Sequence, residues 1–146
     1  MTFFALLVAI LSGAANPFQS ATNGQLNKQL GAPVWAGIIV YATGLLGMLL
    51  IQLFTRQAMP IGKAGSVSWW AWMGGLISIA STIAGLTLVQ KLGAGIFTSL
   101  SVTASLVVSV LLDQFGLLGL KQHTATPGRL IGCGLLIAGV WLVSRS

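Results

Sequence analysis

Charged side chains are scarce in this chain. Lys, Arg, Asp and Glu make up 5% of the 146 residues, whereas a soluble globular domain carries about 25%. Apolar residues make up 55% of the chain and the mean hydropathy is +0.94, more apolar surface than one core of this size can hide. At about 20 apolar residues per span, the chain has room for about five membrane helices. The composition excludes an ordinary soluble domain and predicts an integral membrane protein.

Acidic residues, histidine and cysteine are rarer still. The chain has one carboxylate side chain, Asp113, one histidine, His123, and one cysteine, Cys133. A single cysteine forms neither an intrachain disulfide nor a metal-binding cluster, and the sequence shows no nucleophile–base pair or metal-ligand spacing. We therefore expect no catalytic residues, no metal, no cofactor and no enzymatic activity. Asp113 ends an apolar stretch, where an interfacial or loop-capping role is expected.

The net charge of +6 is spread along the chain. A nucleic-acid site needs clustered Lys and Arg, whereas these seven are never adjacent. Each lies between or beside apolar stretches, as helix-end anchors at a lipid bilayer do: Lys28, Arg56, Lys63, Lys91, Lys121, Arg129 and Arg145. The distribution excludes nucleic acid as a partner and favours the bilayer.

The apolar stretches predict a single all-α membrane domain over residues 1–146. Its five transmembrane helices are expected over 2–30, 34–54, 69–89, 96–112 and 129–143. A loop is expected over Thr55–Ser68, a tight turn over Gln90–Gly95 and a last loop over Gly116–Gly128, because Gly and Pro punctuate these segments.

Polar residues share one face of the first helix. At 100° per residue, five of them fall within an arc of about 100°: Asn16, Gln19, Ser20, Asn23 and Asn27. Such residues are costly at membrane depth, so they line a wet solute pathway or form hydrogen bonds between helices. We favour the pathway, and Asn16, Gln19, Ser20 and Asn23 are predicted to bind substrate.

Hydroxyl residues follow the next helices. Ser78 lies on a face with Gly74, Ser81, Thr82 and Gly85, and Ser105 lies on a face with Thr98, Ser101 and Ser109. Small and hydroxyl residues usually serve close helix packing, which we expect for most of them, while Ser78 and Ser105 fit substrate contact equally well. Tyr41, the only tyrosine, either contacts substrate or belongs to an interfacial aromatic belt.

The last helix carries widely spaced glycines. Gly128 and Gly132 form a GxxxG motif, and Gly139 follows seven residues later. Glycines on one face let helices approach closely. We expect Gly128, Gly132 and Gly139 to serve helix association, including association between subunits.

These features together resemble the YdcZ family of the drug/metabolite transporter superfamily. The similarity covers nearly the whole chain and rests on the order of six short motifs: Gln19-x-x-x-Asn23-x-x-Leu26, Leu30-Gly31-x-Pro33, Trp69-Trp70-x-x-x-Gly74, Leu92-Gly93-Ala94, Leu111-Leu112-Asp113-x-Phe115-Gly116 and Gly139-Val140-x-Leu142-Val143. Many members carry Gln at the position of Ser105, so the resemblance implies a shorter polar contact there, or none.

The resemblance implies a five-helix half-transporter in the inner or plasma membrane. Related small multidrug-resistance exporters work as antiparallel dimers, and related ten-helix transporters contain two inverted five-helix halves. Those small exporters use a membrane-embedded Glu in the first helix for proton exchange. Gln19 and Asn23 occupy the polar face here and cannot titrate, so that coupling chemistry does not carry over.

The sequence is compatible with two functions, a transporter and a non-transporting membrane protein. The leading hypothesis is a secondary transporter or facilitator of a small polar, neutral or zwitterionic organic solute, working by alternating access at a two-fold dimer interface. The rival is a non-transporting membrane scaffold or accessory subunit, in which the polar stripes only hold helices together. Near-balanced positive charge on the two sides of the membrane predicts insertion in both orientations. An antiparallel homodimer is therefore expected, with a heterodimer with a paralog as the alternative.

Overall fold

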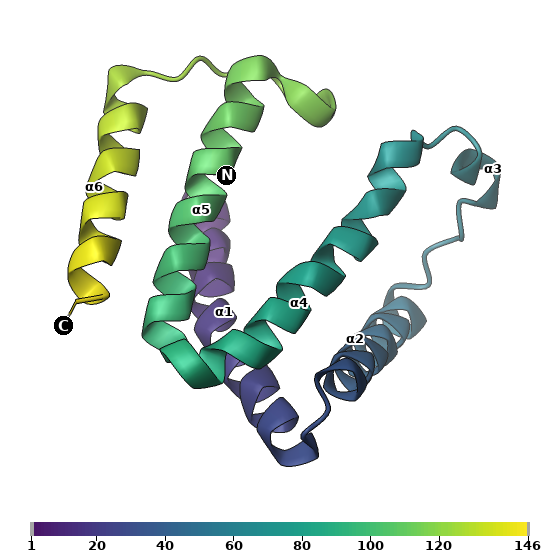
Figure 1. The fold of residues 1–146 in the computed structure, drawn as a ribbon. Helices are drawn as coiled ribbons and strands as arrows, with labels where there is room; N and C mark the ends of the chain where they lie inside the picture. Colours follow the sequence, from purple (N-terminus) through teal and green to yellow (C-terminus); the bar gives the residue numbers. More distant parts are fainter. Residues whose placement is uncertain (1, 146) are drawn as a thin grey trace. The chain divides into compact units, whose positions relative to one another are not determined.

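The computed structural model describes residues 2–145, and its regular elements within that range are all helices (Figure 1). Five are long: α1 (Thr2–Leu30), α2 (Pro33–Thr55), α4 (Met73–Leu92), α5 (Ala94–Phe115) and α6 (Pro127–Val143). Three short elements lie in the connections: α3 (Ile61–Ala64) and the 3₁₀ turns η1 (Trp69–Trp72) and η2 (Leu117–Gly119). The all-helical fold predicted from the apolar stretches is confirmed.

Four segments are long and apolar enough to cross a membrane: Phe3–Leu30, Pro33–Thr55, Trp69–Leu92 and Ala94–Phe115. The fifth long helix, α6, is apolar but has 17 residues. At 1.5 Å per residue it is about 26 Å long, less than the roughly 30 Å of a bilayer's hydrocarbon core. A helix of this length spans only where the bilayer is thinned locally or where flanking residues reach to the headgroup region.

The helix ends differ from the sequence expectation between α4 and α5. No separate turn occupies Gln90–Gly95, because α4 continues to Leu92 and α5 starts at Ala94. Gln90 and Lys91 are good helix formers, so they extend the helix. Gly93 adopts φ +84°, a left-handed conformation that glycine takes without strain, and this single residue joins the two helices. At the other end of α4, Trp69–Trp72 form a 3₁₀ turn before the α-helix begins at Met73.

Residues 18–91 form one compact unit, in which α1 and α2 each contact α4. Gly24 of α1 lies against α4 so closely that an added Cβ would sit 3.4 Å from Cγ1 of Val89. Gly37 of α2 lies against Leu86 of α4, at 3.6 Å by the same measure. Leu86 is fully buried. Two glycines thus let α1 and α2 approach one segment of α4.

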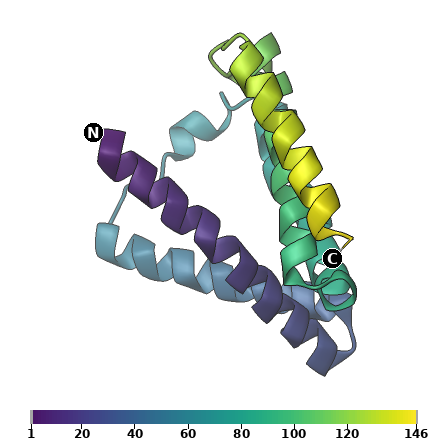
Figure 2. The same cartoon turned by 90° about the vertical axis from the view of Figure 1, so that its left-hand side faces the viewer.

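The second unit contains α5 and α6 together with the first part of α1. Helices α5 and α6 lie side by side in both views (Figures 1 and 2). Their connection is fastened to the end of α5: the main-chain carbonyl of Asp113 accepts from the His123 N–H at 2.9 Å, and the Gln122 side chain donates to the Gln114 carbonyl at 2.9 Å. Cys133 of α6 is buried. This connection fixes α5 and α6 as a helical hairpin.

Candidate substrate site

Three hydroxyl groups meet where α2 passes α4. The Tyr41 hydroxyl lies 2.9 Å from Oγ of Ser78 and 2.9 Å from Oγ1 of Thr82. Tyr41 is eight residues into α2, which places it about 12 Å along that helix, and Ser78 and Thr82 are one turn apart on α4. The structure thus brings together two residues that the sequence predicted for the site, Tyr41 and Ser78. It adds Thr82, which the sequence pattern had assigned to packing.

An open cavity adjoins this hydroxyl cluster of Tyr41, Ser78 and Thr82. Its volume is about 520 Å³, and its walls are almost wholly apolar, drawn from α2 and α4: Val34, Gly37, Ile38, Tyr41, Gly75, Ile79 and Ile83. Tyr41 belongs to both the cavity wall and the cluster. The cavity is therefore an apolar compartment, and neither Ser78 nor Thr82 lines it.

The polar face of α1 is largely unpartnered. Asn16 and Gln19 are exposed, and Ser20 and Asn23 are half-buried. Within residues 2–145 none of these four side chains makes a hydrogen bond. A carboxamide in a membrane helix needs water, a ligand or another protein surface to satisfy it. These side chains are therefore available for such a partner.

Asn27, the last member of the same stripe, has a different environment. Its Nδ2 donates to the main-chain carbonyl of Leu86 at 2.8 Å, which ties α1 to α4. Its Oδ1 is buried and has no hydrogen-bond partner within the described chain. Asn27 joins two helices, as expected if the polar face of α1 forms hydrogen bonds between helices. The other four polar residues of this face form no such bond in the described chain.

Within the unit formed by residues 18–91, α1 and the Tyr41 hydroxyl contact different parts of α4 in this conformation. Gly24 contacts α4 at Val89 and Gln90, whereas Tyr41 contacts it at Ser78 and Thr82. Thr82 and Gln90 are eight residues apart, about 12 Å along the helix. The hydroxyl cluster and the contact that holds the polar face of α1 are thus distinct places on α4. Asn16 and Ser105 belong to the other unit, in which Ser105 is exposed on α5.

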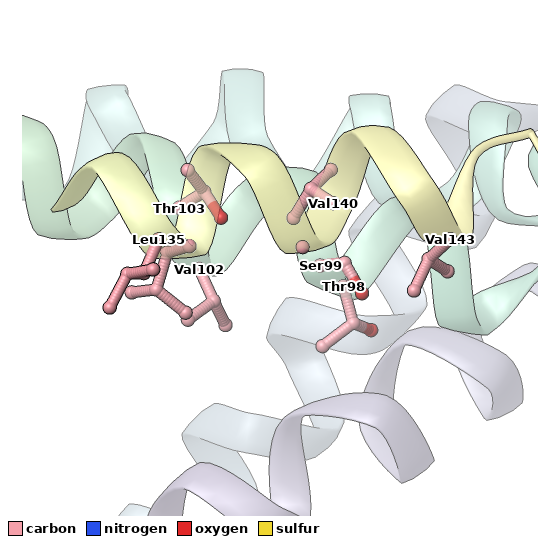
Figure 3. A pocket seen from close by; sticks show the side chains of 9 residues that line it. Thr98, Ser99, Val102, Thr103, Leu135, Val140 and Val143 are labelled. Atoms are coloured by element: carbon pink, nitrogen blue, oxygen red, sulfur yellow. The ribbon is translucent and has the colours of Figure 1, made fainter. Parts of the chain in front are cut away.

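The glycines of α6 make no close approach within the described chain. An added Cβ would meet no atom within 4 Å at Gly132 or Gly139, and only the Thr126 hydroxyl, at 4.0 Å, at Gly128. Gly139 instead lines a cavity of about 360 Å³ between α5 and α6 (Figure 3). Thr98, Ser99 and Thr103 face it from α5, with Leu135, Val140 and Val143 from α6 (Figure 3). Gly132 lines a second cavity with Leu106 and Ser109 of α5, so Gly132 and Gly139 both border the groove between α5 and α6.

Asp113 forms an ion pair. Its Oδ2 lies 3.2 Å from Nη1 of Arg129, which joins the end of α5 to the start of α6. The Asp113 side chain is 30% exposed and that of Arg129 is 42% exposed. The interfacial or loop-capping role expected from the sequence stays a prediction, and the side chain pairs with Arg129 where the connection between α5 and α6 ends. No group of three or more His, Cys, Asp or Glu side chains that could hold a metal lies within residues 2–145.

Comparisons with known proteins give a consistent result. Residues 4–142 match the model of a family described as "Putative inner membrane exporter, YdcZ". The chain is also similar to the inner membrane protein YdcZ of Escherichia coli (strain K12), with 30% identity over 112 residues that cover 74% of each chain. No solved structure matches it.

Proposed function

The chain belongs to the YdcZ family of inner-membrane proteins, and from this premise we propose that it is a secondary transporter or facilitator of a small organic solute. The family description is that of an exporter, which is not an enzyme class. The chain is a multi-pass protein of the inner membrane, in keeping with its apolar helices. Its solute is proposed to be polar, and neutral or zwitterionic, because carboxamides both donate and accept hydrogen bonds.

The observation that carries the proposal is the open polar face of α1. Gln19 and Asn23 lie in a membrane-spanning segment, carry full hydrogen-bonding capacity and bond to nothing in the described chain. If a carboxamide faced lipid without a hydrogen-bond partner, it would cost several kcal/mol. A solute pathway satisfies them with water and substrate. We propose Asn16, Gln19, Ser20 and Asn23, with Tyr41, Ser78 and Ser105, as substrate-binding residues.

Alternating access at a two-fold interface is the proposed mechanism. Two copies in opposite orientations would surround one pathway with the polar faces of both α1 helices. The groove between α5 and α6, which Gly132 and Gly139 line, supports this arrangement because it leaves room for a neighbouring helix. The second copy is proposed to be the same chain, with a paralog of fixed orientation as the alternative.

Gln19→Leu tests the site. Purified protein is screened by thermal shift against neutral and zwitterionic solutes, because a ligand of the folded state raises apparent stability. The flux of the solutes that stabilise the protein is then measured in proteoliposomes. We expect Gln19→Leu to abolish the solute's stabilising effect and its flux while leaving the dimer intact. Gln25→Leu is the matched control, because Gln25 lies on the opposite side of the same helix.

Two results would contradict the proposal. If Gln19→Leu binds solute normally, or if it dissociates the dimer, the polar face of α1 is a packing surface. If no stabilising solute crosses proteoliposome membranes containing the wild-type protein, the chain is a scaffold or accessory subunit.

A further inference from the structure

The ion pair between Asp113 and Arg129 lines a cavity between α5 and α6. The cavity has a volume of about 250 Å³, and both charged residues belong to its wall. The other lining residues are Leu106, Ser109 and Val110 of α5 and Gly132 of α6. The cavity therefore has a positive and a negative group in one wall and apolar side chains beside them.

The ion pair leaves much of its hydrogen-bonding capacity unused. A guanidinium has five N–H donors, and a carboxylate accepts through both of its oxygens. Within residues 2–145 the Arg129 side chain makes one hydrogen bond, from Nη1 to Oδ2 of Asp113 at 3.2 Å, and Oδ1 of Asp113 makes none. The two side chains are also partly exposed. A ligand can therefore accept from Arg129 and donate to Asp113 while the two residues stay paired.

The two opposite charges favour a zwitterionic ligand. A cation alone would be attracted by Asp113 and repelled by Arg129, and an anion alone would meet the reverse. A zwitterion places its anionic group on Arg129 and its cationic group on Asp113. Guanidinium groups bind phosphate especially well, through parallel N–H donors. An ammonium group with N–H protons is the matching donor for a carboxylate.

The position of the cavity along the helices indicates a lipid. Asp113 is two residues before the end of α5, and Arg129 is the third residue of α6, so both charges lie at one end of this helical hairpin. Leu106 is seven residues before Asp113, about 10 Å nearer the middle of α5. Helix α5 is long and apolar enough to cross a membrane, and charged residues at the end of a span lie at the level of the headgroups. The cavity thus fits a molecule with a charged head and an apolar part below it.

We propose that this cavity binds a phospholipid whose headgroup carries a phosphate and a primary ammonium, as phosphatidylethanolamine does. The phosphate accepts hydrogen bonds from Arg129, and the ammonium donates to Asp113. The glycerol ester region lies beside Leu106 and Val110. This lipid site goes beyond the proposed transport, because its ligand belongs to the bilayer and is not the transported solute.

Two further residues of the cavity agree with a bound lipid. The Ser109 hydroxyl lines the cavity one turn below Asp113 and makes no hydrogen bond within residues 2–145, so it can donate to an ester carbonyl. Gly132 adds no side chain to the wall, which leaves room for the lipid. Gly139 is about 10 Å further along α6, so that end of the groove stays free for a neighbouring helix.

A pair of lipids tests the proposal. We would measure the Kd of dioleoylphosphatidylethanolamine and of dioleoylphosphatidylcholine for the purified wild-type protein in one detergent, by native mass spectrometry. The two lipids share their acyl chains and phosphate, but the trimethylated ammonium of choline has no N–H to donate. We expect the ethanolamine lipid to bind about tenfold more tightly, as one hydrogen bond to a charged group allows. Glycerophosphoethanolamine, which has the same headgroup without acyl chains, should bind about a hundredfold more weakly than the lipid, because it has no apolar part to bury.

Four variants assign the roles of the side chains. Asp113→Asn keeps the shape and removes the negative charge, so the preference for ethanolamine over choline should vanish. Arg129→Gln removes the partner of the phosphate, so the affinity for both lipids should fall about tenfold. Ser109→Leu fills the cavity and leaves both charges in place, so it should also weaken both lipids, even if a charge variant fails to fold. Arg145→Gln is the control and should bind both lipids normally, because Arg145 stacks on Trp141 and does not line the cavity.

Three results would overturn the lipid site: equal affinity of the wild type for the two lipids, an undiminished preference in Asp113→Asn, or a loss in Arg145→Gln as large as that in Arg129→Gln. Binding of glycerophosphoethanolamine as tight as that of the lipid would also overturn it and would assign the cavity to a free zwitterion. The proposed transport is tested by solute flux, which is a separate measurement.

Discussion

At the scale of single residues, Asn23 and Asn27 lie one helical turn apart on α1 and have different surroundings. Asn27 bonds to the carbonyl of Leu86, whereas Asn23 is half-buried and has no partner in the described chain. The close approach of Gly24 to α4 brings Asn27 within bonding distance of that helix. One stripe of similar side chains thus contains both a structural residue and candidates for substrate binding.

Gly24→Leu tests the contact between α1 and α4. An added Cβ already lies 3.1 Å from Nε2 of Gln90 and 3.4 Å from Cγ1 of Val89, so a larger side chain must displace α4. Overpacking of this kind costs about 1–3 kcal/mol, which should lower the thermal melting temperature. Gly13→Leu on the same helix is the control, because an added Cβ there meets nothing within 4 Å. Equal melting temperatures of the two variants would contradict the close contact between α1 and α4 at Gly24.

At the scale of helices, the apolar stretches were sufficient to predict the long helices but not all of their ends. Pro33 and Gly31 limit α1 and α2 as expected, because proline restricts the residue before it and Gly31 takes a positive φ. The end of α4 was placed too early, since Gln90 and Lys91 looked like a turn but continue the helix to Leu92. A polar residue after an apolar span does not end a helix by itself.

The candidate site was less predictable than the helices. Helical periodicity placed Ser78 and Thr82 on one face of α4, and it identified Tyr41 as a candidate on α2. It could not show that Tyr41 meets both hydroxyls, because that contact joins residues 37 and 41 positions apart. Thr82 was therefore assigned to packing. Pairings between helices depend on how the helices cross, which a single-helix pattern does not contain.

Asp113→Asn tests the role of the ion pair between α5 and α6. The two side chains are 30% and 42% exposed, and an exposed pair contributes at most about 1 kcal/mol. The main-chain bond from His123 N–H to the Asp113 carbonyl survives the substitution. We expect a small fall in melting temperature and near-normal solute affinity. A large loss of affinity would place Asp113 in the substrate or coupling site.

Across the chain as a whole, few apolar side chains are buried within either compact unit. Among the described residues, the buried apolar side chains are Ala36, Leu86, Val89 and Cys133. Lipid covers apolar surface without cost, but it does not satisfy the polar face of α1. A second copy would cover part of that face and leave the remainder for solute. The proposed dimer would thus satisfy part of the open carboxamides of α1.

The distribution of positive charge predicts insertion in both orientations. With the N-terminus inside, the inner segments carry four residues, Arg56, Lys63, Lys121 and Arg129, and the outer segments carry three, Lys28, Lys91 and Arg145. The side of the membrane whose loops carry more Lys and Arg stays cytoplasmic, and a difference of one residue gives only a weak preference for either orientation. We expect a tag on one terminus to be accessible from both sides of the membrane. A dimer found wholly in one orientation, with no other chain present, would contradict this.

A chain biased towards one membrane orientation tests whether solute transport needs copies in both orientations. Two added Lys residues in the Thr55–Ser68 connection should favour the form with its N-terminus inside and reduce solute flux. Co-expression of a copy biased the opposite way should restore the flux. Restoration by a second copy of the same bias would indicate a parallel dimer.

We propose that the polar face of α1 borders a water-filled solute pathway within the membrane. A cysteine reacts with a membrane-impermeant maleimide only where water reaches it, because the thiolate is the reactive form. The measurement is labelling of Asn23→Cys in a Cys133→Ser background, with Ala21→Cys, about 160° away around the helix, as the control. We expect Asn23→Cys to be labelled and Ala21→Cys to remain unlabelled. No labelling at Asn23→Cys, or equal labelling at both positions, would contradict it.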